Sequence, residues 1–251
     1  MTASLGDAPA APSAEAAPRP NTLQRIAGVL MSPAQTFEDV ARRPDVVFPL
    51  LIIVAISVIT TLLIVPRVDF AATYREAFES ANMPPQQMER SIRIAAAFGK
   101  AIAYFGPLLQ VVAFAVIGGV LLIAFRVFGG EGDFKQAFSV TLYSWMPLCI
   151  KSVLATGVLL TKKTMTLVDL ANPLRSNLAF LADMKGRPIL FSLLGSLDLF
   201  TIWTLVLVII GFAAISRLSR VRSSAIVISL WLVVVLFKVG GAAIGAARMQ
   251  K

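Results

Sequence analysis

Long stretches of this chain carry no charged side chain, and short polar connections separate them. Runs without Asp, Glu, Lys or Arg cover 46–66 and 101–125, and runs with a single charge cover 136–161, 188–216 and 223–247. A helix needs about 20 apolar residues to cross the hydrocarbon core of a bilayer. The pattern therefore predicts an all-α, polytopic membrane protein whose five transmembrane helices form a membrane domain over 46–248.

The segment 21–45, before the first span, shows a helical pattern with one apolar face. Ser32, Pro33 and Gln35 suit a helix start, because serine caps helix N-termini and proline is favoured at the first position. The apolar face consists of Leu23, Ile26, Leu30, Phe37, Val40 and Ala41. We expect an amphipathic juxtamembrane segment on the membrane surface, with an ordinary solvated helix as the alternative. Residues 1–20, rich in Ala and Pro, predict a disordered N-terminal tail.

The lengths of the connections constrain the topology. The short links 126–135 and 217–222 make the second and third spans, and the fourth and fifth, antiparallel hairpins. Lys and Arg are nearly balanced between the two faces, so charge counting leaves the orientation open.

Composition excludes several classes of function. The chain is 57% hydrophobic and only 15% charged, so water is not its main solvent. Its net charge of +9 is dispersed among the connections, which favours attraction to anionic lipid headgroups and argues against nucleic acid. With no His and with Cys149 as the single Cys, neither a Cys/His metal site nor a His-dependent catalytic site can be assembled. A phosphate-binding loop is also missing, so we expect no enzymatic activity and no cofactor.

Three charged residues interrupt the last three spans: Lys151, Asp198 and Lys238. At about 1.5 Å per residue, each lies roughly 15 to 17 Å from the same membrane face, so they are expected to share one intramembrane charge layer. Charges at this depth cost several kcal/mol unless they are paired or hydrated. One reading is interhelical glue, with Asp198 paired and one lysine in surplus. The other is a polar cavity that binds an anion or relays protons.

A pair of glycines lies late in the fifth span. Gly241 and Gly245 form a small-xxx-small pattern, which permits close helix approach. We expect tight packing within the bundle, with a contact between two copies of the chain as the alternative.

Several short motifs resemble, in order and spacing, the Yip1-domain family of five-span membrane proteins, in particular its bacterial branch. Tyr143 with Pro147-Leu148 is similar to the tyrosine-to-proline signature of that family. The other motifs are Met31-Ser32-Pro33 with Thr36-Phe37, the run from Gly129 to Phe138, Asn172-Pro173-Leu174, and Ser196-Leu197-Asp198-Leu199-Phe200. The resemblance extends over roughly 24–247.

The resemblance implies a five-helix fold with a cytoplasmic N-terminal segment, here in a bacterial inner membrane. Well-studied eukaryotic relatives are membrane adaptors that associate with Rab GTPases. This chain lacks the acidic Asp-Leu-Tyr-Gly-Pro block of those relatives, so Rab binding is not transferred to it.

The sequence supports two hypotheses for the function. The first is a non-catalytic membrane adaptor or organising protein, with membrane proteins, cytosolic proteins or further copies of the chain as partners. The second is a small transporter or channel that uses the layer of Lys151, Asp198 and Lys238 near the bilayer midplane.

Overall fold

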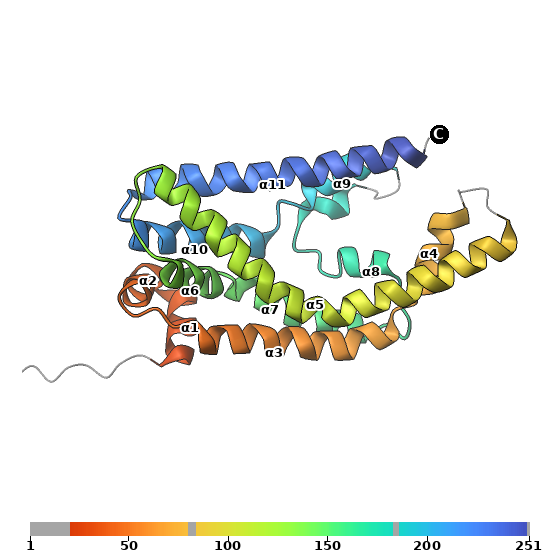
Figure 1. The fold of residues 1–251 in the computed structure, drawn as a ribbon, viewed down its shortest axis with the longest axis horizontal. Coiled ribbons are helices and arrows are strands. Elements are labelled where there is room, and N and C mark those ends of the chain that lie inside the picture. The colour runs from red at the N-terminus through yellow and green to blue at the C-terminus, as the bar shows by residue number, and fades with distance from the viewer. Residues whose placement is uncertain (1–20, 80–83, 183–185, 250–251) are drawn as a thin grey trace, which may run out of the picture.

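The structure is a computed structural model that describes residues 21–79, 84–182 and 186–249 (Figure 1). The first half of the chain forms α1 (Thr22–Met31), α2 (Pro33–Arg42), α3 (Val47–Ile64), the short helix η1 (Val65–Arg67), α4 (Phe70–Glu79) and α5 (Pro85–Val127). The second half forms α6 (Phe134–Ser144), α7 (Met146–Leu160), α8 (Leu167–Ala171), η2 (Leu178–Leu181), α9 (Pro188–Leu194), α10 (Leu199–Ser216) and α11 (Arg220–Met249). The predicted tail, 1–20, lies outside the described residues.

Within the described residues, five helical segments are long and apolar enough to cross a membrane, as predicted. They are Val47–Arg67, Pro85–Val127, Phe134–Leu160, Leu199–Ser216 and Arg220–Gly245. The second segment is a helix of 43 residues. It begins well before the predicted span 101–125, because a charged stretch of good helix formers precedes the apolar one. The third segment is divided at Trp145, where α6 ends and α7 begins with a proline in its first turn.

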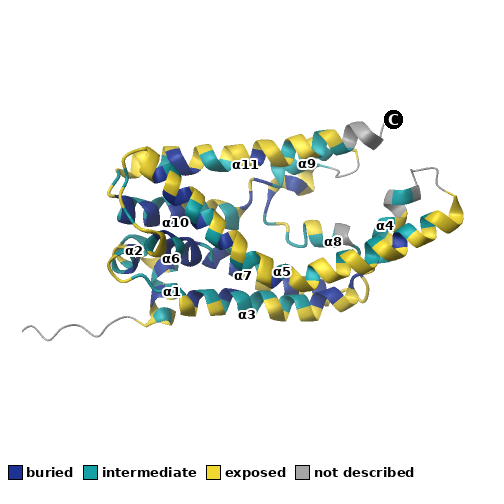
Figure 2. Cartoon of the chain, viewed as in Figure 1, coloured by how far each residue is buried: buried dark blue, intermediate teal, exposed yellow. Residues whose placement is uncertain are grey.

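The spans are arranged around α10. This helix packs against α2, α6, α7 and α11, while α3 packs against α5 and α7. In Figure 1, α11 and α3 lie on opposite sides of the bundle, with α10, α6 and α7 between them. Figure 2 shows exposed residues along α3, α5 and α11 and buried residues in α2, α6 and α10. The exposed surface of the three outer helices is rich in large apolar side chains, which suits contact with lipid.

The largest buried cluster lies at the end of the bundle that carries α1 and α2. It includes Phe37, Phe125, Tyr143 and Phe212, each of them fully buried, and the rings of Phe125 and Phe212 have centroids 4.9 Å apart. The apolar face of α2 therefore packs into protein. This differs from the expected position of segment 21–45, whose apolar face was predicted to enter the membrane surface.

Gly211 of α10 explains the docking of α2. A side chain at position 211 would overlap Val140 of α6, and its Cβ would lie 3.0 Å from two ring carbons of Phe37. The missing side chain thus creates the space into which α2 inserts its phenylalanine. Helical periodicity identifies an apolar face, but it does not say whether lipid or protein covers that face.

The connection between α5 and α6 is fixed against the end of α10. Gly129 (φ 82°) and Gly132 (φ 111°) adopt left-handed backbone conformations that favour glycine. The Glu131 amide donates a hydrogen bond to the Ser216 carbonyl, at 3.0 Å. The Asp133 side chain then caps α6 by accepting from the Gln136 amide, at 2.8 Å.

Candidate intramembrane polar site

Asp198 lies at a break in the predicted fourth span. The sequence predicts one helix over 188–216, whereas the chain forms α9 and then α10, with Gly195–Leu197 between them. Asp198 is the N-cap of α10, and its Oδ1 atom accepts hydrogen bonds from the amides of Phe200 and Thr201, both at 3.1 Å. Aspartate is favoured at helix N-caps, and its negative charge suits the positive end of the helix dipole.

The second carboxylate oxygen of Asp198 binds two side chains from other parts of the fold. Lys151 Nζ, from α7, lies 2.9 Å from Asp198 Oδ2, and Ser176 Oγ donates to the same oxygen at 2.5 Å. The Asp198 side chain is 1% exposed. Ser176 belongs to the long connection between α7 and α9, so this connection folds back to the level of the helix break.

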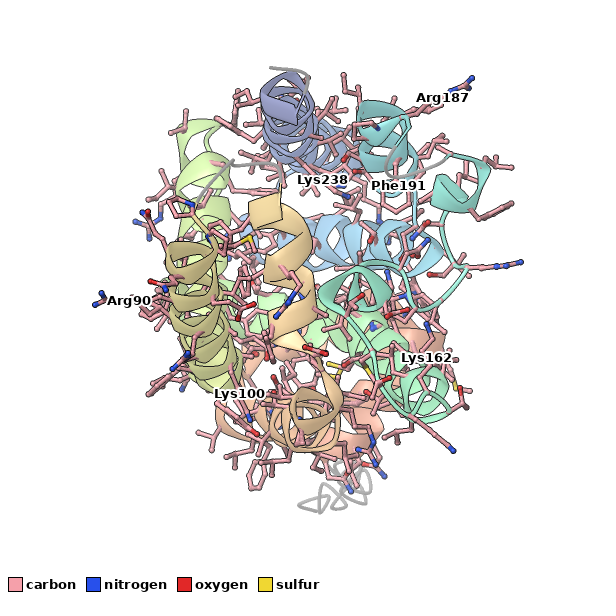
Figure 3. The ribbon with its side chains drawn as sticks, turned by 90° about the vertical axis from the view of Figure 1, so that its right-hand side faces the viewer. Arg90, Lys100, Lys162, Arg187, Phe191 and Lys238 are labelled. Carbon is pink, nitrogen blue, oxygen red and sulfur yellow. The ribbon has the colours of Figure 1, made fainter. Side chains whose placement is uncertain are left out.

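Lys238 of α11 reaches the same break from the other side. Its Nζ atom lies 3.3 Å from Ser196 Oγ, two residues before Asp198. Figure 3 views the bundle along its length and shows Lys238 and Phe191 near the facing sides of α11 and α9, whereas Arg187 points outward. Among the described residues, no carboxylate forms an ion pair with Lys238. The structure thus brings the three predicted charges together at one level. Lys151 and Asp198 form an ion pair, and Lys238 lies beside this pair.

The glycine pair of the fifth span does not pack within the bundle. A Cβ atom built at Gly241 or Gly245 would meet nothing within 4 Å. The expected tight packing is therefore wrong for this chain on its own. Both glycines lie near the C-terminal end of α11.

The two residues of the tyrosine-to-proline motif have separate roles. Pro147 lies in the first turn of α7, just after the division of the third span. Tyr143 is fully buried, and its hydroxyl donates to Asp45 Oδ2 at 3.3 Å. Asp45 lies in the connection between α2 and α3, so Tyr143 links the core of the bundle to the start of the first span.

We expect the Tyr143→Phe variant to lose about 1 kcal/mol of unfolding free energy, because one hydrogen bond to a carboxylate is removed while the ring still fills its site. Chemical unfolding of the purified protein in detergent micelles measures this loss. Tyr104→Phe on the exposed side of α5 is the matched control and should leave stability unchanged.

Sequence reasoning missed a polar network that holds α1 and α2 to the bundle. Arg25, with 8% of its surface exposed, forms an ion pair with Asp39 at 2.8 Å and donates to the Arg43 carbonyl at 3.1 Å. Thr22 Oγ1 donates to Asp45 Oδ2 at 2.8 Å, and Ser139 Oγ to the Asp45 carbonyl, also at 2.8 Å. The sequence does indicate this network, because Arg25 and Asp39, which carry opposite charges, directly adjoin residues of the apolar face.

A small polar cavity is a further feature that the sequence pattern did not predict, because its polar lining residues are uncharged. It has a volume of about 150 Å³ and lies between α3, α5 and α7. Ser57, Thr60, Gln110 and Ser152 contribute polar groups to its lining. Uncharged polar side chains of this kind form hydrogen bonds between helices, and the hydroxyls of Thr60 and Thr156 lie 3.1 Å apart.

The described residues contain no group of three or more His, Cys, Asp or Glu that could hold a metal ion. Cys149 is a buried free thiol of α7. The donor set of the site is instead one carboxylate, two ammonium groups and several hydroxyls. Such a set can form hydrogen bonds and one ion pair.

Comparisons with known proteins give results that agree with one another. Residues 27–241 match the Yip1 domain family, a range that includes every residue of the charge layer. The chain is 26% identical over 210 residues to the membrane protein YknW of Bacillus subtilis (strain 168), which covers 84% of this chain and 86% of that protein. No solved structure matches the chain.

Proposed function

The chain belongs to the Yip1 domain family of membrane proteins, and from this premise we propose that it is a non-catalytic adaptor or organising protein. In this proposal the bundle is the anchor, and the face that carries α1 and α2 recruits membrane or cytosolic partners. We further propose a bacterial inner membrane with that face in the cytoplasm. The relative in Bacillus, itself a membrane protein, supports the bacterial setting.

The observation that carries the proposal is the saturation of Asp198. A carboxylate has about four acceptor positions, and here two amides, one ammonium group and the Ser176 hydroxyl occupy them, with the Thr201 hydroxyl as a further donor at 3.4 Å. A site that binds and releases an ion needs vacant acceptors or a carboxylate that changes partners. The closed arrangement therefore supports a structural role for the Lys151–Asp198 pair, and with it a bundle that serves as a scaffold.

The recruiting surface consists of the exposed side of α1 and α2. Met31, Gln35 and Glu38 lie on it, opposite the buried side chains of Val29, Phe37 and Val40. Since α2 packs against α10 and α6, deletion of 21–45 would open the core and so test folding instead of recruitment.

Photo-crosslinking tests recruitment without disturbing the core. A photoreactive amino acid at Gln35 or Glu38 should yield discrete protein adducts in cells, and the same probe at the lipid-facing Leu232 of α11 should yield none. Adducts of equal yield from all three positions, or none from α2, would contradict the adaptor proposal.

Transport remains a second candidate because of Lys238. It is the member of the layer without an acidic partner among the described residues, and it lies beside a broken span, a feature that many transporters place at substrate sites. Under the adaptor proposal, Lys238→Met should change unfolding free energy by less than about 1 kcal/mol, because only one long hydrogen bond is lost.

Ion and solute flux in liposomes containing the purified protein separates the two functions. We expect no flux above that of empty liposomes, for the native protein and for Lys238→Met alike. Flux that depends on Lys238 would favour transport and would contradict the adaptor proposal.

A further inference from the structure

A basic pocket lies at the opposite end of the bundle from α1 and α2. It has a volume of about 500 Å³ and contains three cationic side chains, Arg67, Lys100 and Lys163, and one carboxylate, Asp69. The cations come from η1, α5 and the connection after α7. Asp69 and Arg67 are each partly engaged elsewhere. Asp69 Oδ1 accepts from the Ala72 amide at 2.8 Å, at the start of α4, and Arg67 Nη1 donates to the Leu63 carbonyl.

Backbone contacts hold the walls of this pocket in place. The Met165 amide donates to the Arg67 carbonyl at 3.1 Å, and the Asp69 amide donates to the Met165 carbonyl at 2.7 Å, which fixes Lys163 beside η1. The third wall is fixed at Gly99, where a Cβ atom would lie 3.3 Å from the ring of Phe70. The three cations are thus positioned by folded elements.

The pocket lies at the level where charged residues first interrupt the apolar runs of α3 and α5. Leu62 and Leu63 are exposed on the last turn of α3 before Arg67, and Ile102 is exposed on α5 just after Lys100. Arg67 is the first charge after the apolar run of α3, and Lys100 is the charge that adjoins the apolar run of α5, beyond which exposed Phe98 and Ile94 alternate with charged residues. Phospholipid headgroups lie at this boundary, and basic pockets between transmembrane helices are suited to their phosphates.

We propose that this pocket binds the phosphate ester of an anionic phospholipid, with Arg67, Lys100 and Lys163 as its cationic ligands. The Thr164 hydroxyl supplies an additional donor, and the apolar lining, which includes Pro66, Phe70 and Ala96, faces the first carbons of the lipid. The neighbouring Lys162 takes no part, because it forms an ion pair with Asp169. This hydrogen bond from Lys162 is the main cause that holds the pKa of Asp169 below its usual range.

Native mass spectrometry of the full chain tests the proposal. The protein is taken from nanodiscs made of equimolar phosphatidylglycerol and phosphatidylcholine, and the retained lipids are counted. The native protein should retain phosphatidylglycerol preferentially. Each of Arg67→Gln, Lys100→Gln and Lys163→Gln should lower that preference about fivefold, since a cation near the headgroups contributes about 1 kcal/mol.

Matched controls separate this site from general charge attraction. Arg90 lies on the same helix as Lys100 and points away from the bundle in Figure 3, so Arg90→Gln removes the same charge without touching the pocket. Both Arg90→Gln and Lys162→Gln should retain the native preference. Lys100→Arg should retain it too, which shows that loss in Lys100→Gln reflects charge and not misfolding.

Competition distinguishes a lipid from a free anion. Inorganic phosphate and soluble glycerol phosphate, added before measurement, should leave the retained phosphatidylglycerol unchanged. Displacement by either compound would overturn the assignment to a lipid, and equal loss in Lys100→Gln and Arg90→Gln would overturn the site itself.

Discussion

Replacement of Asp198 by alanine should lower the unfolding free energy by about 3 kcal/mol or more, a large effect for one side chain of this bundle. The variant removes the N-cap of α10, worth about 1 kcal/mol, and leaves the Lys151 ammonium within the bundle without its carboxylate partner. Unfolding by sodium dodecyl sulfate in mixed micelles, followed by far-UV circular dichroism, measures the loss. Native stability in this variant would contradict the structural role assigned to the pair.

Two further variants divide the effect of Asp198 into its parts. Asn caps a helix about as well as Asp, so Asp198→Asn removes the charge and keeps the cap. The double variant Lys151→Met with Asp198→Asn removes both charges, and it should be more stable than Asp198→Asn alone, because no unpaired lysine remains. If the double variant were the less stable of the two, the pair would not be the source of the loss.

The second large effect is expected at Gly211. A leucine there would overlap Val140 and displace the Phe37 ring, so α2 could not dock against α10. Gly211→Ala should lower the unfolding free energy by about 1 to 3 kcal/mol, and Gly211→Leu by more. The same unfolding assay measures both, and exposure of α2 to a protease reports the undocking directly.

Gly157 of α7 is the matched control for Gly211. Apart from the adjacent part of its own helix, nothing lies within 4 Å of a Cβ built at position 157, so Gly157→Ala should be neutral or should stabilise the helix by up to about 1 kcal/mol. A similar loss at both positions would show that the effect at 211 arises from helix flexibility and not from packing against Phe37.

The five spans were predictable because the hydrocarbon thickness sets the length of each apolar run. Where each residue packs within the bundle was harder to predict from the sequence. Phe37 and Val40 form an apolar face in the sequence, yet only their burial in the core cluster, with Phe37 beside Gly211, shows that protein covers this face. Gly241 and Gly245 show the converse, since their spacing permits close packing without supplying a neighbour.

The sequence predicted the common depth of the three charged residues in the membrane, but not the local structure around them. Equal depth in the last three spans indicated that Asp198 would pair with one of the two lysines, and in the structure Lys151 Nζ lies 2.9 Å from Asp198 Oδ2. The count of apolar residues treated Asp198 as an interruption within one helix. Asp198 is instead the N-cap of α10. Its other oxygen accepts from Ser176, which belongs to a distant connection and has no counterpart in the local pattern.

The short fourth span bears on how the protein is made. With 18 residues, α10 is near the lower limit for a helix that enters a bilayer on its own. Only three residues separate it from α11, and Arg217, Arg220 and Arg222 cluster at that turn. We therefore expect the insertion machinery to accept α10 and α11 together as one helical hairpin, whose arginines remain on the side of synthesis. Asp198, at the end of α10 far from these arginines, would then meet Lys151 in a span that is already in place.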